Sequence, residues 1–129
     1  MIVDTSAMVA IFYGEPEAAG FTRLIHDAAV TRISVANLVE LSMVIEKQLG
    51  PEGMRQVEAF FRRAAISVEP VTVEQGNLAR QAFLDFGKGR HRAALNFGDC
   101  FAYALAKDLD EPLLFKGKDF TETDIRSAA

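Results

Sequence analysis

Four short apolar segments alternate along the chain with longer segments that have helical spacing. The apolar segments are MIV at residues 1–3, TRIS at 31–34, ISVEPV at 66–71 and PLLFKG at 112–117. The helical segments are 5–14, 15–30, 35–50, 51–65, 72–87 and a last one that begins near residue 95. Because strands that alternate with helices favour parallel pairing, we predict an α/β layer fold with a short, mostly parallel central sheet. A length of 129 residues, half of them hydrophobic, suits one domain over residues 1–129.

Local signals support these boundaries. Ser34 and Thr72 are of the type that caps a helix at its N-terminus, and each directly precedes or opens a helical segment. Gly14 closes the first helical segment, and the pair Gly50-Pro51 predicts a stop between the third and the fourth. In an open parallel sheet, ligand sites lie at the carboxyl ends of the strands, so residues that follow the strands become candidates for a site.

Three carboxylates stand alone in apolar segments. Asp4 ends the first strand and is the only charged side chain before Glu15. Glu40 lies about two turns into an apolar helix, and Asp99 lies near the start of the apolar segment LNFGDCFAYALAK. Burying an unpartnered carboxylate costs several kcal/mol, as an order of magnitude. Asp119 follows the last strand and is the fourth candidate for the same edge of the sheet.

Each acid also has an ordinary explanation. Asp4 is well placed to cap the next helix, and Asp99 lies at a helix start where Asn96 competes as the cap. Glu40 is more difficult to explain as a cap, and a salt bridge to a nearby arginine is its best alternative. One shared cation would offset all the buried charges together, and Mg²⁺ and Mn²⁺ prefer such oxygen ligands. The isolation of the acids therefore favours a shared metal site.

The charge balance limits the possible partners. A formal net charge of −4 argues against a domain that binds nucleic acid through its overall charge. A local basic loop, KGRHR at residues 88–92, leads into the Asp99 segment. We predict that Arg90, Arg92 and Lys116 line a groove and bind phosphate groups, although a merely solvated loop is the alternative.

The chain shows no signal for export or for a membrane. The N-terminus lacks a basic region and meets an acid at position 4, and no apolar run approaches the length of a membrane span. The single cysteine, Cys100, lies in the apolar helical segment, where a small core side chain is expected. We therefore expect a cytoplasmic protein with no membrane association and no intrachain disulfide.

With these residues in view, the sequence resembles the PIN-domain ribonucleases, and among them the VapC-type toxins of bacterial toxin–antitoxin modules. The matching pieces are IVDTSAMVAIF, VANLVELSMVIE, GKGRHRAALNFGDCFAYALAK and PLLFKGKDFTETDI, which run nearly end to end. The resemblance implies a three-layer α/β/α sandwich. It also implies an acidic quartet of Asp4, Glu40, Asp99 and Asp119. Asp4 and Asp99 are its implied metal ligands, and Ser6 a supporting hydroxyl.

The resemblance further implies an activity and its partners. These are metal-dependent cleavage of RNA with Mg²⁺ or Mn²⁺, neutralisation by a VapB-type antitoxin, and a homodimer. Asp124 is a candidate outer acid, with an ordinary surface carboxylate as the alternative.

Two rival functions fit less well. A phosphatase with an aspartyl nucleophile would normally place a second acid two residues after Asp4, where Ser6 stands instead. A phospho-receiver module needs an aspartate that ends a middle strand, but ISVEPVTV offers only Glu69 in mid-run.

Overall fold

Four short parallel strands form the central sheet of the computed structural model, which describes residues 1–129. The strands are β1 (Ile2–Val3), β2 (Arg32–Ser34), β3 (Ser67–Glu69) and β4 (Leu113–Leu114). Their order is β3-β2-β1-β4, and every neighbouring pair is parallel. The predicted parallel sheet is confirmed, and all its strands end at one common edge.

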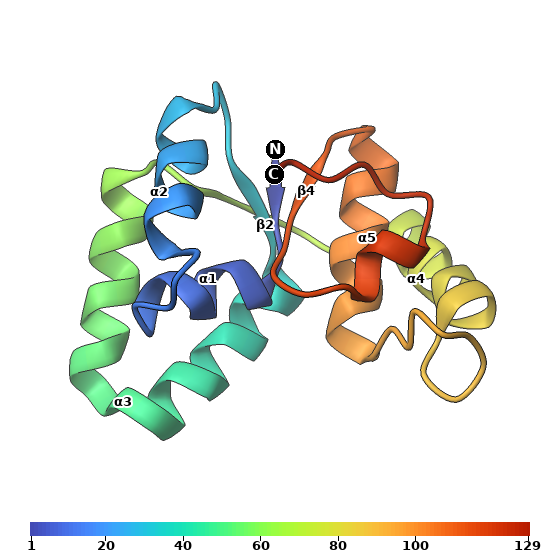
Figure 1. Cartoon of the computed structure of the whole chain (residues 1–129), viewed down its shortest axis with the longest axis horizontal. Coiled ribbons are helices and arrows are strands. Elements are labelled where there is room, and N and C mark those ends of the chain that lie inside the picture. The colour runs from blue at the N-terminus through green and yellow to red at the C-terminus, as the bar shows by residue number, and fades with distance from the viewer.

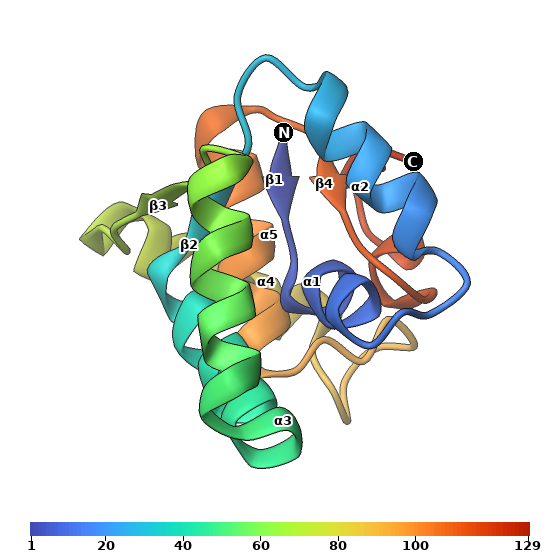
Figure 2. The same ribbon diagram turned by 90° about the vertical axis from the view of Figure 1, so that its left-hand side faces the viewer.

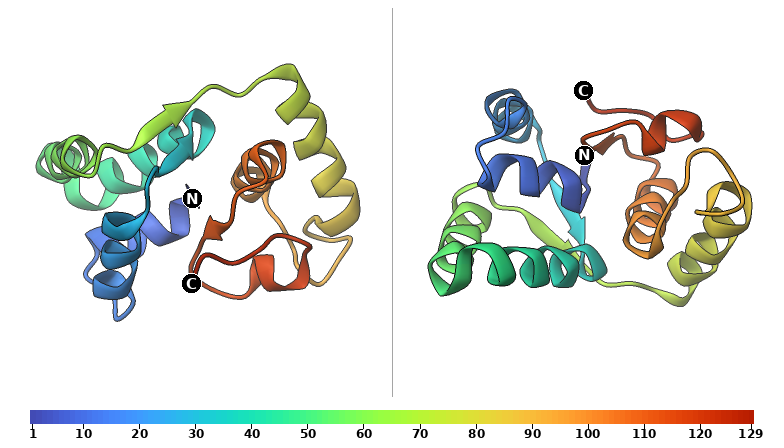
Figure 3. Two further views of the ribbon diagram at one scale, coloured as in Figure 1. Left: turned by 90° about the horizontal axis from the view of Figure 1, so that it is seen from above. Right: turned by 60° about the horizontal axis from the view of Figure 1, so that its bottom comes forward.

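Helices cover both faces of this sheet, as the three-layer prediction requires. One layer consists of α1 (Thr5–Phe12), α2 (Ala18–Asp27) and α3 (Val35–Arg63). The other consists of α4 (Val73–Phe86) and α5 (Phe97–Leu109). The strands run between the two groups of helices in Figures 1 and 3, and Figure 2 shows α1, α2 and α3 in front of the sheet. A short 3₁₀ helix, Asp119–Glu122, follows β4.

The core is divided by the sheet into two clusters because side chains alternate along a strand. Ile2 and Leu113 pack with the buried side chains of α4 and α5. Val3 and Leu114 pack with those of α1, α2 and α3. Each two-residue strand therefore supplies one fully buried side chain to each layer, which explains why the strands read as continuous apolar runs.

The predicted stop at Gly50 takes the form of a sharp kink. Gly50 has φ 64° and ψ −161°, so helical geometry ends there and resumes with Pro51 in the first turn of the next segment. α3 therefore changes direction midway, as Figure 1 shows. Ser34, directly before α3, caps the helix, because its side chain accepts a hydrogen bond from the Ala36 amide.

None of the helices combines the length and apolar character needed to cross a lipid bilayer.

Candidate metal centre

The carboxyl edge of the sheet opens into a small polar cavity of about 230 Å³. Its lining comes from the ends of β1 and β4 and from the facing turns of α3 and α5. The lining residues are Asp4, Thr5, Ser6, Glu40, Val44, Asn96, Asp99 and Asp119. The structure thus places all four predicted acids around one cavity, although they lie up to 115 positions apart in the chain.

Asp4 lies at the junction of β1 and α1 and is 2% exposed. Its Oδ2 accepts hydrogen bonds from the Ser6 amide (3.0 Å) and the Ser6 hydroxyl (2.5 Å), so Asp4 does cap α1. The Ser6 hydroxyl in turn accepts a bond from the Lys116 amide (3.0 Å). Asp4 Oδ1, in contrast, is buried without a hydrogen-bond partner. The cap therefore accounts for one carboxylate oxygen and leaves the other one unexplained.

Burial weakens the acidity of Asp4. Desolvation raises the pKa of Asp4 to about 6 against the lowering effect of the Ser6 hydrogen bonds, and the nearby Glu40 adds to the increase. A buried oxygen with no donor and an elevated pKa is a site where a cation would replace the missing interactions.

Asp99 combines a structural and a chemical position. The Asn96 side chain caps α5, because its Oδ1 accepts a hydrogen bond from the backbone amide of Asp99 (2.9 Å). The backbone amide of Asn96 donates in return to Asp99 Oδ2 (3.0 Å). This reciprocal capping box uses only one carboxylate oxygen. Desolvation raises the pKa of Asp99 to about 7, and repulsion from Asp4, Asp119 and Glu40 contributes to the increase. The capping alternative and the ligand interpretation are thus compatible.

Glu40 is held by neutral donors. The Thr5 hydroxyl donates to Glu40 Oε1 (2.5 Å), and Asn37 Nδ2 lies 3.4 Å from the same oxygen. No arginine or lysine pairs with it, so the alternative of a salt bridge is wrong. Its charge remains directed at the acidic cavity.

Two further residues fix the position of Glu40 relative to α5. Asn37 is fully buried, and its Nδ2 donates to the Gly98 carbonyl (2.9 Å), which links α3 to the first turn of α5. A Cβ at Gly98 would clash with Glu40 Oε2, so glycine is needed for the carboxylate to keep its observed position. Sequence reasoning missed Thr5, Asn37 and Gly98; the signal for Asn37 is a polar residue three positions before Glu40 on the same helix face.

Asp119 lies further out. It opens the 3₁₀ helix that follows β4, is exposed, and lines the cavity. It has no hydrogen-bond partner in the protein, but its charge contributes to the raised pKa of Asp99.

The donor set fits a hydrated divalent cation. No three His, Cys, Asp or Glu side chains form a ready-made ligand cage. Mg²⁺, however, usually keeps several waters and takes one or two carboxylates from the protein. Asp4 Oδ1 is available for this purpose because it is buried and unpartnered, and Asp99 keeps one carboxylate oxygen outside its capping box.

The cations predicted to bind phosphate have mixed surroundings. Lys116 Nζ pairs with Glu15 and lies 3.5 Å from Glu17, and Arg92 Nε lies 2.8 Å from Glu122. Arg90 has no acidic partner, and its guanidinium carbon lies 6.0 Å from the centre of the Phe83 ring. The structure therefore leaves only Arg90 of these three without an acidic partner.

Asp124 lies outside the cavity. It accepts hydrogen bonds from the Tyr103 hydroxyl (2.7 Å) and from Lys107 Nζ (2.8 Å), which lower the pKa of Asp124 although desolvation opposes them. Of the two alternatives, the surface carboxylate is the one observed, paired here with Lys107.

The sequence matches the PIN domain family over residues 1–126, and the chain belongs to that family.

Within it, the chain is 44% identical over its whole length to the ribonuclease VapC30 of Mycobacterium tuberculosis, covering 98% of that protein. It is 45% identical to a VapC ribonuclease of Mycolicibacterium smegmatis, with 97% of each chain covered. The chain is thus a member of the VapC group, as its motifs predict.

Solved structures agree on the fold. The VapC20 toxin of M. tuberculosis, described as cleaving the sarcin–ricin loop, superposes with a TM-score of 0.77 at 20% identity, covering 96% of this chain and 95% of that one. A toxin–antitoxin complex from Klebsiella pneumoniae superposes with a TM-score of 0.70 at 15% identity, covering 95% and 92%.

Proposed function

We propose that this protein is a metal-dependent endoribonuclease and the toxin of a type II toxin–antitoxin system. The observation that carries the proposal is the buried, unpartnered Asp4 Oδ1 in a cavity shared with Glu40, Asp99 and Asp119. The VapC relatives, at 44–46% identity, are named as ribonucleases and so indicate the reaction class.

In this proposal Asp4 and Asp99 hold Mg²⁺ or Mn²⁺. When bound, a divalent cation of this kind activates water and neutralises charge on the attacked phosphate. Ser6 orients Asp4 by binding its Oδ2, so that Oδ1 remains free to bind the metal ion. The Ser6 hydroxyl also accepts a hydrogen bond from the Lys116 amide and lines the cavity, so it supports Asp4 and keeps one acceptor position towards the substrate.

Glu40 and Asp119 complete the acidic quartet around the cavity. Thr5 and Asn37 hold the Glu40 carboxylate with neutral hydrogen bonds, which leaves it without a cationic partner in the protein. Asp119 is exposed and is placed to orient water at the mouth of the cavity. Without metal, burial and the neighbouring acids raise the pKa of Asp99 to about 7, so protons and a divalent cation compete for this cluster near neutral pH.

The partners follow from the same site. The substrate is RNA, and Arg90 and Arg92 beside the Asp99 helix are candidates to bind its phosphates, with Arg92 weakened by its pairing to Glu122. A VapB-type antitoxin in the cytoplasm would inhibit the enzyme by placing a basic side chain in the acidic cavity. Two copies of the chain are proposed to associate as a homodimer, which sedimentation analysis would test.

The structure supplies no basis for the phosphatase alternative. The position two residues after Asp4 is filled by the Ser6 hydroxyl, which donates to Asp4 and carries no second acid.

The experiment that tests the function uses end-labelled structured and unstructured RNAs with antitoxin-free protein. Mg²⁺, Mn²⁺ or EDTA is added, and an Asp99→Asn variant is purified in the same way. We expect discrete cuts that require metal and disappear in the variant. Equal behaviour of the two proteins with every RNA and metal would contradict the proposal.

A further inference from the structure

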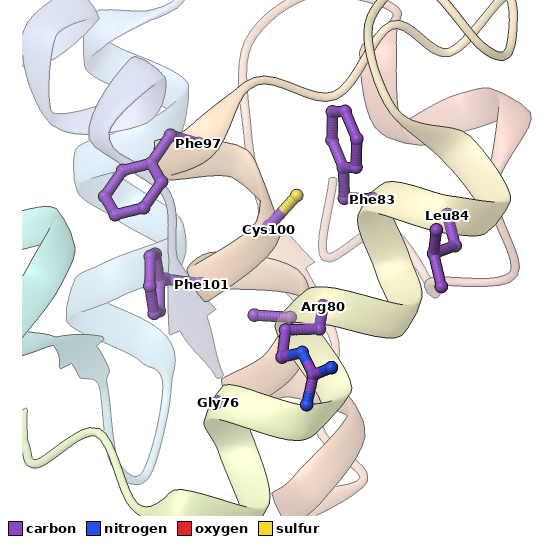
Figure 4. A pocket seen from close by; sticks show the side chains of 8 residues that line it. Gly76, Arg80, Phe83, Leu84, Phe97, Cys100 and Phe101 are labelled. Atoms are coloured by element: carbon purple, nitrogen blue, oxygen red, sulfur yellow. The ribbon is translucent and has the colours of Figure 1, made fainter.

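A second cavity lies directly beside the acidic one. It is a groove of about 470 Å³ between α4 and α5, and we call it the aromatic groove. Its lining residues are Gly76, Ala79, Arg80, Phe83, Leu84, Phe97, Cys100 and Phe101. Figure 4 shows Phe97, Cys100 and Phe101 coming from α5, and Arg80, Phe83 and Leu84 from α4.

The large side chains of this groove are exposed to an unusual degree. Phe97 is 80% exposed, and Leu84 and Phe83 are 53% and 42% exposed. Phe97 packs edge-to-face against Phe101, with ring centres 4.8 Å apart, so its ring is oriented although it is exposed. An exposed but oriented aromatic ring is a surface on which a planar group can stack.

The charges around the groove are positive and unpaired. None of the lining residues is acidic, and Arg80 forms no ion pair. Arg90, from the loop between α4 and α5, lies over the Phe83 ring and also lacks an acidic partner. Aromatic rings beside unpaired arginines are the combination that binds single-stranded nucleic acid.

The groove and the acidic cavity share the first two turns of α5. Asn96 and Asp99 line the acidic cavity, while Phe97, Cys100 and Phe101 line the aromatic groove. Residues 96–101 span roughly 7.5 Å along a helix axis, at about 1.5 Å per residue. A nucleotide chain with a phosphate at Asp99 would therefore have a neighbouring base within reach of Phe97.

We propose that the aromatic groove is a nucleobase subsite, in which an unpaired base flanking the cleaved phosphodiester stacks on Phe97. This inference rests on the proposed ribonuclease function. Arg80 and Arg90 bind the phosphates on either side of that base. A second copy of the chain is the competing occupant, and the experiment below distinguishes it from RNA.

The chain contains no tryptophan, so a Phe97→Trp variant carries a single fluorescent reporter in the groove. The Asp99→Asn change is added to prevent cutting, and RNA binding is followed independently by the anisotropy of an end-labelled strand. We expect unstructured RNA to quench the tryptophan emission. An abasic strand of the same length and charge should bind through its phosphates without quenching.

A Val30→Trp variant, also with Asp99→Asn, is the matched control, because Val30 is 45% exposed and precedes β2 at the opposite edge of the sheet. For the Phe97→Trp variant, quenching by the abasic strand, or RNA binding without quenching of the introduced tryptophan, would overturn the base subsite. An emission that changes with protein concentration in the absence of RNA would overturn it as well, because a second copy would then fill the groove. Absence of RNA binding in the anisotropy signal would instead refute the proposed function.

Steady-state cleavage provides a second readout. We expect Phe97→Ala to raise KM on the order of tenfold, in line with the stacking contribution per base, and to change kcat less. Phe97→Tyr should restore KM, because the ring is retained. Gly76→Leu should place a side chain in the groove and raise KM, since a Cβ at Gly76 meets no atom within 4 Å, and an unchanged melting temperature would verify that the fold is kept. An unchanged KM in both Phe97→Ala and Gly76→Leu would contradict the subsite.

Discussion

The acidic cavity and the aromatic groove lie on either side of the first two turns of α5, and they are built in opposite ways. In the acidic cavity, hydrogen bonds from Ser6, Thr5, Asn37 and Asn96 hold three of the carboxylates. In the aromatic groove, the side chains are mostly apolar and partly exposed. The difference teaches that chemistry at a phosphate needs fixed charges, whereas binding of a flexible strand needs accessible surface. Changes in the cavity should alter the rate of cleavage, and changes in the groove should alter affinity.

The largest expected effect is the loss of either proposed metal ligand. Loss of a residue that only supports a metal ligand typically costs about 10- to 100-fold in activity. Asp4→Asn and Asp99→Asn remove the proposed ligands themselves, so each should lower kcat for RNA cleavage by at least about 10²-fold. RNA affinity, measured by anisotropy in EDTA, should not fall, because without metal each change only removes a negative charge. Cleavage that stays within a few-fold of the wild-type rate would contradict the role of that carboxylate.

A smaller effect should follow from a single methyl group between α3 and α5. In Gly98→Ala the new Cβ would clash with Glu40 Oε2, so the carboxylate or the helix must shift. We expect the rate of cleavage to fall roughly tenfold, the size of effect that is usual when a residue supporting a metal site is displaced. Thermal stability should also fall.

Gly20→Ala in α2 is the control for this change, because a Cβ there meets nothing within 4 Å. It should stabilise the protein by about 1 kcal/mol through helix propensity and leave cleavage unchanged. If Gly98→Ala behaves in the same way, Glu40 does not need its observed position.

The clustered charges should also make stability depend on pH. The pKa values of Asp4 and Asp99 rise from 3.8 to about 6 and about 7, so the folded state binds more protons than the unfolded state in this range. Without metal, the free energy of unfolding should therefore fall as pH rises from about 4 to about 7. Denaturant titrations of wild type and Asp99→Asn measure this.

The slope should be shallower in Asp99→Asn, which has lost the group with the higher pKa. Millimolar Mg²⁺ or Mn²⁺ should raise the melting temperature of the wild type above pH 7, where the carboxylates are ionised. Equal slopes in the two proteins would place the charge repulsion elsewhere. A melting temperature that does not respond to either metal would count against a metal site at these acids.

The smallest effect distinguishes the two arginines of the basic loop. Arg90 has no acidic partner, whereas Arg92 pairs with Glu122. Arg90→Gln should therefore reduce the salt dependence of RNA affinity by about 0.7 in log–log slope, the value for one phosphate contact on a single strand. Arg92→Gln should change the slope less. If neither variant changes it, the loop is merely solvated.

Much of this site can be predicted from the sequence, because its acids interrupt segments that are otherwise apolar. Asp4, Glu40 and Asp99 are isolated charges in apolar segments, and a parallel sheet brings its strand ends to one edge. The strands and the break at Gly50 are equally visible, because apolar runs and a Gly-Pro pair act locally.

The remaining features depend on contacts between distant segments. Asn37 meets Gly98 across 61 positions, and Lys116 meets Glu15 across 101 positions, so no local pattern indicates either contact. Phe97 is indistinguishable in sequence from the core residues of its helix, yet it is 80% exposed. The aromatic groove was therefore not predictable, whereas the acidic cavity was.

The central claim is that Asp4 and Asp99 together hold a divalent cation, and titration calorimetry with Mn²⁺ tests it most directly. The titration is run at pH 7 in two buffers of different ionisation enthalpy, with wild type, Asp4→Asn and Asp99→Asn. We predict saturable binding to the wild type with release of protons, because the pKa of Asp99 is about 7 and the ligands must ionise. Each variant should bind at least tenfold more weakly and release fewer protons. Absence of saturable binding to the wild type, or equal binding by all three proteins, would contradict the account.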